Sequence, residues 1–391
     1  MLKKFIINVV ILIAPFVLLG SFFLSYLTKT GELYYSYNDL LYCQQLNEPC
    51  LIGLAHTNPA SKIKVLSLTS KKYDVIVLGT SRVMSFRSSF FKAGSFYNAG
   101  GCIYRIKNMR NFFAKIPRSN YPKVLILGLD QNFFNAQWDN NYSSDSAYVT
   151  ELNKAYSFSA TAQEAFLGLL GDIKNRKISI KDIRQGFKKP SYRKRGLTAF
   201  YKENGFINDG SYYYGDVVTD PNSENLADYK FKDTLDRIAK GNRLFEHGKE
   251  INPAAIEELR LFLDECRQNN IHVVGFIPPY AQEIYDKLIK MEDNYSYIKK
   301  VYPAIREVFA KYNYPVMDFT DMKSFGAPRE EIVDGIHASE KAYLRIFLEL
   351  IDKDPMLKSF SADEKYLKMR LANASSPVVV FSMDESVAAG K

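Results

Sequence analysis

The sequence predicts an α/β protein. A parallel sheet of about five strands is expected to carry helices on both faces, with a transmembrane helix before it and a large insertion within it. Short continuous apolar runs, such as residues 73–79 and 123–130, have the length of fully buried strands. Segments with helical spacing alternate with these runs, which favours parallel strands joined by helices. Residues 5–27 contain no charged side chain.

The uncharged segment 5–27 predicts a membrane anchor, because about 20 apolar residues span a bilayer as a helix. Lys3 and Lys4 precede it, so residues 1–4 are expected in the cytoplasm and the rest of the chain on the periplasmic or extracellular side. A cleaved signal peptide is the alternative. Its apolar region would have about 7–15 residues and end at a small-residue site. The run is longer than that, so we favour a single-pass anchor in the cytoplasmic (inner) membrane.

The chain after the anchor is expected to divide into five segments. Residues 28–72 are predicted to be a polar and aromatic connector without a clear period. The first part of the α/β domain, residues 73–134, follows. Its predicted strands lie at 73–79, 95–101 and 123–130, and its predicted helix lies at 104–116. Residues 135–250 interrupt the alternation and are predicted to be an insertion over one face of the domain.

The insertion has three recognisable segments, a possible helix at 161–173, a basic stretch at 174–196 and an aromatic turn at 204–215. The second part of the domain then covers 251–354. Asn252 and Ser339 are candidate N-caps of its first and last helices. Its predicted helices lie at 253–268, 281–290, 296–312 and 340–351, and its predicted strands at 271–277 and 314–320. In the weakly patterned tail, 355–391, residues 377–383 are either an edge strand or a disordered end.

Composition narrows the class of partner. The net charge of +9 is compatible with nucleic acid, an anionic membrane surface or an acidic polymer. The anchor puts the folded part outside the cytoplasm, so no nucleic-acid partner is expected. Cys43 and Cys50 bracket a short loop and are either a disulfide or two free thiols. No cysteine spacing suits zinc, so neither a metal nor a cofactor is expected.

Ser81 follows the first predicted strand in a small polar turn and is a candidate nucleophile. A serine needs a neighbouring base. Of the four histidines, His337 follows the last predicted strand and precedes a helix. Loops at the carboxyl ends of parallel strands meet in one crevice, so Ser81 and His337 are expected to meet there. Asp334, three residues earlier, is placed to orient the imidazole. An exposed Asp-Gly turn is the alternative for these last residues.

Acyl transfer also needs donors for the oxyanion of the tetrahedral intermediate. The Ser81 backbone N–H is one candidate. Gly100 and Gly101, after the second predicted strand, are others, because glycine lets the backbone approach a substrate closely. Asn132, after the third strand, is a further candidate, although it could also cap its own turn.

These residues resemble the four sequence blocks of the SGNH (GDSL-type) hydrolase superfamily. The blocks here are "GTSR", "NAGG", "GLDQN" and "DGIH", in the family's order. The resemblance implies a flavodoxin-like three-layer sandwich, with Ser81 as nucleophile, Gly100 or Gly101 in the oxyanion hole, and Asp334 and His337 as acid and base. Thr80 stands where the family has Asp, and the third block departs from Gly-x-Asn-Asp.

Together with the single anchor, these motifs look most like the membrane-tethered branch of the superfamily. That branch acts in polysaccharide O-acetylation and teichoic-acid D-alanylation, often with a membrane-bound acyltransferase partner. The expected function is therefore a serine esterase or O-acyltransferase acting on an acylated glycan or another envelope polymer. Candidate substrate-binding residues are Arg82, Asp130, Tyr212, Tyr213 and Tyr214. A non-catalytic scaffold with this fold and a lipid or lysophospholipid esterase are the alternatives.

Overall fold

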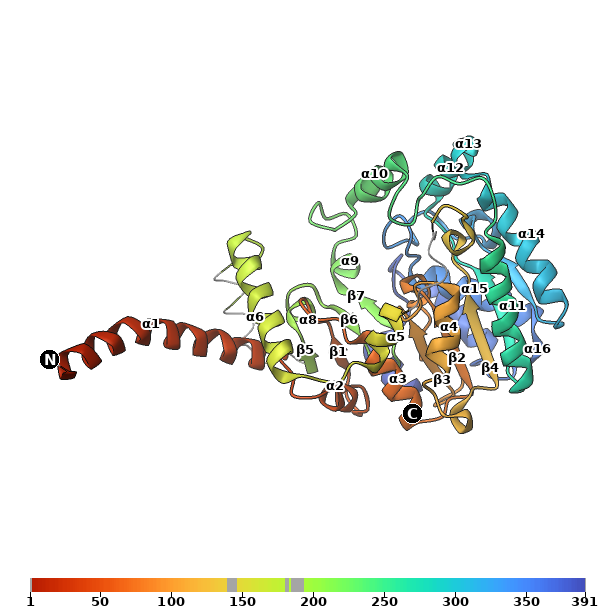
Figure 1. Cartoon of the computed structure of the whole chain (residues 1–391). Coiled ribbons are helices and arrows are strands. Elements are labelled where there is room, and N and C mark those ends of the chain that lie inside the picture. The colour runs from red at the N-terminus through yellow and green to blue at the C-terminus, as the bar shows by residue number, and fades with distance from the viewer. Residues whose placement is uncertain (1, 139–145, 180–182, 184–192, 391) are drawn as a thin grey trace.

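The computed structural model describes residues 2–138, 146–179, 183 and 193–390. Its main sheet has five strands, all parallel, in the order β3-β2-β4-β8-β9 (Figure 1). The strands are β2 Val75–Gly79, β3 Phe96–Gly100, β4 Val124–Gly128, β8 His272–Ile277 and β9 Val316–Asp318. The predicted parallel sheet of five strands is confirmed.

Both faces of this sheet are buried. Side chains alternate along a strand, so Ile76 and Leu78 of β2 enter one apolar cluster while Val75 and Val77 enter another. The first cluster includes residues of several helices, among them the first four given next, and the second includes seven residues of another helix. These helices are α4 Ile106–Phe113, α11 Pro253–Gln268, α12 Gln282–Lys290, α14 Tyr297–Ala310 and, in the second cluster, α15 Glu340–Lys353.

The two predicted N-caps are confirmed. Asn252 Oδ1 accepts a hydrogen bond from the Ala254 N–H at 3.0 Å, with Pro253 at the first position of α11. Ser339 Oγ accepts from the Ala342 N–H at 3.2 Å at the start of α15. Each side chain satisfies a donor that a helix leaves free in its first turn.

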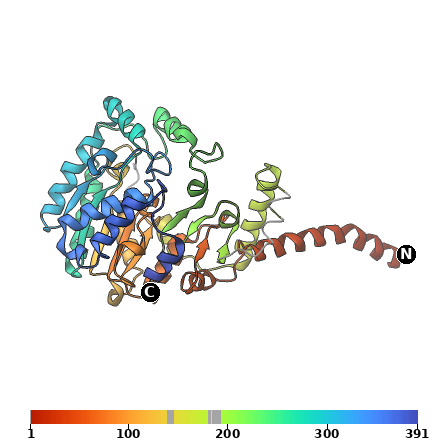
Figure 2. The same ribbon diagram turned by 180° about the vertical axis from the view of Figure 1, so that it is seen from behind.

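Helix α1, Leu2–Lys29, extends away from the folded part of the molecule (Figures 1 and 2). It is long and apolar enough to cross a bilayer. Its outer residues are exposed, for example Leu12 at 68% and Phe16 at 72%. Only its end packs against the protein, through Phe23, Tyr26 and Leu27. The pattern suits a helix whose apolar surface is covered by lipid.

The connector is more ordered than its sequence indicated. It contains α2 Tyr37–Gln44, β1 Cys50–Ile52 and α3 Ala60–Ser70. Strand β1 belongs to a second sheet of four short strands, in the order β5-β1-β6-β7. The other three strands come from the insertion: β5 Arg193–Arg195, β6 Asn204–Phe206 and β7 Tyr212–Tyr214. The expected aromatic turn is thus a hairpin, and parts of the connector and the insertion together form this small sheet beside the main one (Figure 1).

The rest of the insertion is mostly helical. The predicted helix at 161–173 is the longer α6, Phe158–Lys174. Other helices in the described part of the insertion are α5 Ser146–Asn153, α8 Leu197–Lys202, α9 Gly215–Thr219 and α10 Lys232–Lys240. Much of the predicted basic stretch, residues 180–182 and 184–192, lies outside the described residues.

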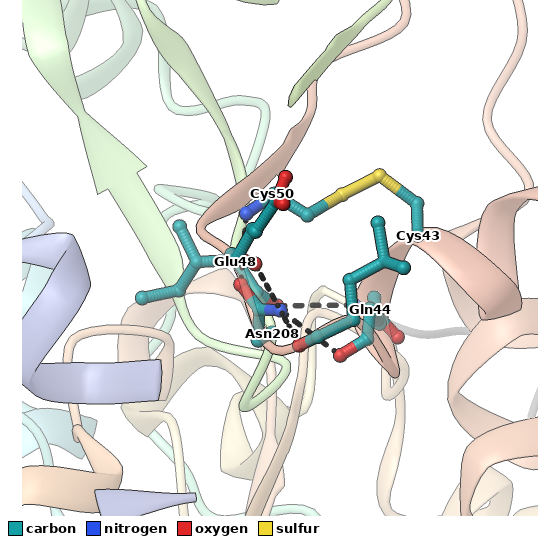
Figure 3. Close-up of a disulfide and its surroundings, with 7 residues drawn as sticks. Cys43, Gln44, Glu48, Cys50 and Asn208 are labelled. Atoms are coloured by element: carbon teal, nitrogen blue, oxygen red, sulfur yellow. Dashed lines mark hydrogen bonds between the residues drawn. A yellow bond between two sulfur atoms is a disulfide. The ribbon is translucent and has the colours of Figure 1, made fainter. Parts of the chain in front are cut away.

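A disulfide joins Cys43 of α2 to Cys50 of β1, which decides between the two alternatives for this pair (Figure 3). Asn208 lies beside it and closes the same loop. Its Oδ1 accepts from the Cys50 N–H at 2.9 Å, and its Nδ2 donates to the carbonyls of Gln44 and Glu48, both at 3.1 Å. The loop is therefore closed covalently by its own disulfide, and hydrogen bonds from Asn208 tie it to the insertion.

The tail is neither an edge strand nor a disordered end. It forms α16 Pro355–Lys358, α17 Glu364–Asn373 and α18 Met383–Ala389, seen from behind in Figure 2. The segment before α18 packs against α15, where Glu340 Oε1 accepts from the N–H groups of Val380 at 2.9 Å and Phe381 at 2.8 Å. Hydrogen bonds to a buried carboxylate replace the strand pairing that the apolar run suggested.

Candidate active site

Ser81 lies at the carboxyl end of β2, where the strand turns into a short 3₁₀ helix, Ser81–Val83. Thr80 caps this helix, because its Oγ1 accepts from the Arg82 N–H at 3.1 Å. Gly79 is needed at the turn, since a Cβ there would lie 2.9 Å from Val83 Cγ1. Ser81 itself is partly exposed. The turn holds the hydroxyl at the edge of the sheet and open to solvent.

The structure brings Ser81, His337 and Asp334 together. His337 Nε2 lies 2.8 Å from Ser81 Oγ, and His337 Nδ1 lies 2.7 Å from Asp334 Oδ2. The Asp334 Oδ1 atom accepts from the N–H groups of Ile336 and His337, both at 2.8 Å. The loop 334–337 thus fixes its own carboxylate and imidazole while the strand end supplies the hydroxyl. This is the order of groups that activates a serine.

The electrostatics keep Asp334 ionised. Burial acts to raise the pKa of this carboxyl, but His337 and the two backbone N–H groups outweigh it, so the pKa lies below its ordinary value. A carboxylate facing Nδ1 favours the tautomer with the proton on that atom. Nε2 is then free to accept the proton of Ser81.

Arg82 and Asp130, predicted to bind substrate, are instead buried inside the protein, at 3% and 1% exposure. The Arg82 guanidinium donates to the carbonyls of Ile336 (3.1 Å), Pro278 (2.9 Å) and Pro279 (2.7 Å), and to Gln131 Oε1 (2.5 Å). It also lies over the Tyr280 ring, 4.4 Å from the ring centre. These contacts use its donors within the protein. Arg82 therefore braces the loops of the site.

Asp130 contacts the turn that carries Ser81. Its Oδ2 accepts from Thr80 Oγ1 at 2.8 Å and lies 3.9 Å from Arg82 Nη1. Burial raises the pKa of Asp130 above its ordinary value, although Arg82, Thr80 and His337 each act to lower it. Asp130 thus positions Thr80, the residue next to Ser81. The sequence had instead predicted that Asp130 contacts the substrate.

The two glycines predicted for the oxyanion hole use their N–H groups inside the protein. The Gly100 N–H donates to Asn98 Oδ1 at 2.7 Å, and the Gly101 N–H donates to the Gly79 and Thr80 carbonyls at 3.1 and 2.9 Å. Gly101 has φ of +82°, a conformation that favours glycine. Both residues therefore shape the backbone behind Ser81, and neither N–H faces a substrate in this structure.

The other two predicted oxyanion donors differ in placement. The Ser81 N–H has no hydrogen-bond partner in the part of the chain that the structure describes. Asn132 is buried, and its Nδ2 is also without a partner among the described residues, but it does not line the cavity described next. The Ser81 N–H is the better placed of the two, because it belongs to the candidate nucleophile itself.

A cavity of about 530 Å³ opens onto Ser81 and His337. Tyr212 and Tyr214 line it, and the Tyr214 ring lies 6.1 Å from the His337 ring. Tyr213 does not line it, because side chains alternate along β7 and its ring lies instead 5.9 Å from the Arg87 guanidinium. Two of the three predicted tyrosines are therefore at the site.

The opposite wall of the cavity was not predicted. It comes from the connector, residues 52–60 with Ile63, and from Glu164 of α6. No Lys or Arg is among the described residues that line the cavity. The only sequence signal for this wall was the apolar triplet at 50–52, which is too short for a strand prediction.

The other three histidines lie elsewhere or have other partners. His272 Nε2 lies 2.7 Å from Asp354 Oδ2, in the structural role expected at a strand start. His247 Nε2 lies 3.2 Å from the Ile238 carbonyl. His56 lines the cavity, but its Nε2 faces Asp172 Oδ2 at 3.5 Å. Only His337 meets Ser81 among the described residues.

Comparison with protein-family models finds no match to the chain, and comparison with curated protein sequences finds none either. Function is therefore argued from the site.

Proposed function

We propose that this protein is a membrane-anchored serine acyl-transfer enzyme, an esterase or O-acyltransferase, that acts on a polysaccharide of the cell envelope. The observation that carries the proposal is the chain of hydrogen bonds from Ser81 through His337 to Asp334 at the mouth of a cavity. A buried scaffold would not need a hydroxyl, an imidazole and a carboxylate aligned at a solvent-accessible edge.

The chemistry follows from the geometry. Ser81 Oγ attacks the acyl carbonyl as His337 Nε2 takes its proton, and the Ser81 N–H is the available donor to the oxyanion. The intermediate collapses to an acyl-enzyme when the protonated His337 gives its proton to the leaving oxygen. Water or a sugar hydroxyl then loses a proton to His337 and attacks the ester, and His337 returns that proton to Ser81 Oγ as the C–O bond to Ser81 breaks. Asp334 holds the imidazole and stabilises its positive charge throughout.

Fold and topology support the assignment to SGNH-type enzymes. In chain order the five parallel strands lie 2-1-3-4-5, the order of flavodoxin-like proteins. Ser81 follows the first of them and the 334–337 loop follows the last. Apolar clusters on both faces suit the three-layer sandwich that we propose.

The proposed location is the outer side of the cytoplasmic membrane. Lys3 and Lys4 precede the span, which favours an N-terminus in the cytoplasm. The disulfide between Cys43 and Cys50 is typical of an oxidising compartment. A membrane-bound acyltransferase that supplies the acyl group is the partner we propose.

The cavity favours a neutral sugar or acyl group at the reacting position. Tyr212, Tyr214 and Phe206 offer aromatic surface, and the described lining carries no Lys or Arg. An anionic stretch of polymer would lack a cationic partner there. Any anionic part of the polymer must therefore be bound outside this cavity.

Labelling with a fluorophosphonate and hydrolysis of p-nitrophenyl acetate by the full-length protein in detergent test the proposal. We expect Ser81→Ala to abolish both, while Ser119→Ala, at an exposed serine, leaves both unchanged. An acetylated glycan as donor and a free glycan as acceptor then separate transfer from hydrolysis. Absence of labelling in folded wild-type protein would favour the scaffold alternative, and activity confined to long-chain esters would favour the lipid esterase.

A further inference from the structure

We infer that helix α6 lies on the outer surface of the bilayer and makes a second membrane contact beside α1. The inference rests on the proposed anchoring by α1 and is independent of catalysis. The occupant of the exposed α6 face is the lipid bilayer itself.

The first observation is that α6 packs on the last turns of the membrane helix. Ala165 and Leu169 of α6 share an apolar cluster with Phe23 and Leu27 of α1. The Phe23 and Phe166 rings meet edge to face, with 6.0 Å between their centres. The middle of α6 is thus held against the end of the apolar run 5–27.

The second observation sets the depth of that contact. At 1.5 Å per residue the run 5–27 is roughly 34 Å long, against about 30 Å for the hydrocarbon core. Phe23 lies four residues before the end of the run, which is about 6 Å along the helix. An element packed on Phe23 therefore lies at the outer boundary of the hydrocarbon. In Figures 1 and 2, α6 runs across the direction of α1, as a helix in the membrane plane would.

The third observation is the outward side of α6. Leu167 and Leu170 are three residues apart, so they lie on one side of the helix, and they are 57% and 38% exposed. Exposed leucines are ordinary on a protein surface, but these two lie at the level of the bilayer boundary. Lys174 and Arg176 are exposed at the C-terminal end of α6. Apolar side chains with flanking basic groups are typical of helices that lie on anionic lipid.

The contact has a consequence for the site. Glu164, on the same helix, lines the cavity that contains Ser81 and His337. One residue of the cavity lining is therefore carried by the helix that we place on the bilayer.

Spin labels on the full-length protein test the inference, in vesicles of phosphatidylethanolamine and phosphatidylglycerol. Labels are placed at Leu167→Cys and Leu170→Cys, since the native cysteines are buried or disulfide-bonded. Leu12→Cys, in the centre of α1, is the positive control, and Met369→Cys, an exposed apolar residue of α17, is the water-facing control. The measured quantity is the ratio of collision rates with oxygen, which enters lipid, and with a water-soluble nickel chelate.

We expect ratios at Leu167 and Leu170 that are several-fold above that at Met369 and below that at Leu12. If the ratios at Leu167 and Leu170 equal that at Met369 while the ratio at Leu12 is that of a site deep in lipid, α6 does not touch lipid and the inference is wrong. This outcome includes the case of an α6 face that binds another protein, because the vesicles contain lipid alone. If Leu12 also reads as water-exposed, the proposed anchor itself fails. Repeating the measurement with Ser81→Ala should change none of the ratios.

Discussion

Replacing Arg82 tests whether this residue braces the site, as its burial indicates, or binds substrate. Arg82→Met removes four hydrogen bonds to the carbonyls of Ile336, Pro278 and Pro279 and to Gln131. It also leaves the buried Asp130 carboxylate without its cationic neighbour. Breaking one partner of a buried ionic group costs about 3–5 kcal/mol. The structure therefore predicts a large loss of stability.

The assay is thermal unfolding of the full-length protein in detergent. At about 2.1 cal/mol/K of unfolding entropy per residue, a loss of about 3–5 kcal/mol corresponds to a fall in melting temperature of about 4–6 °C for a chain of this length. Arg82→Lys should lie between wild type and Arg82→Met, because one ammonium group cannot reach the acceptors that a planar guanidinium bridges. Arg329→Met is the matched control, since that side chain is 70% exposed, and should change the stability by less than about 0.5 kcal/mol.

The result that would refute this reasoning is specific. If Arg82→Met melted within about 2 °C of wild type, well inside the shift expected for such a loss, and raised KM for the ester, Arg82 would be a substrate-binding residue. The structural role of Arg82, which is to hold the loops around Ser81 and His337 together, would then be wrong.

Three further predictions concern the reacting groups and the disulfide. Ser81→Ala and His337→Ala should each abolish ester hydrolysis without lowering the melting temperature. The double variant should hydrolyse the ester little more slowly than either single variant, because the groups act as one unit. A further loss of activity equal to the product of the two single losses would contradict this. The pKa of Asp334 is lowered on folding, so its contribution to stability is complete at neutral pH and is lost as pH falls below about 4. The stability difference between wild type and Asp334→Asn should therefore shrink in urea titrations at pH 3, and a constant difference would count against the pairing. Reducing the link between Cys43 and Cys50 should cost about 2.5 kcal/mol by loop-closure entropy, measured by unfolding with and without reductant, and the double alanine variant should not respond to reductant.

The three residues of the hydrogen-bonded chain could be predicted because the rule that locates them is simple. Parallel strands end at one edge, so a serine after the first strand and a histidine after the last were expected to meet, and Ser81 and His337 lie 2.8 Å apart. The strands themselves were visible because both faces of the sheet are buried, which makes each strand a continuous apolar run. Asp334 was predicted from local spacing alone.

Roles that depend on hydrogen-bond partners could not be predicted. A glycine after a strand looks the same whether its N–H faces a substrate or, as at Gly101, two carbonyls of the neighbouring turn. Likewise, a charged residue beside a nucleophile reads as a substrate contact until its partners are known. For Arg82 those partners lie about 50 to 250 residues away along the chain, in three other loops.

The sequence by itself determined the long apolar helix, the parallel sheet and the three residues of the hydrogen-bonded chain, because hydrophobic length, periodicity and loop position are local properties. Only the tertiary structure decided what surrounds them. The cavity wall comes from residues 52–60, in a connector whose one strand, β1, has three residues and pairs with β5 and β6 from the insertion. So short a strand carries no periodic signal, and its stability comes from non-local partners, from the disulfide at Cys50 and from burial. Such contacts exist only once distant segments of the chain have been brought together.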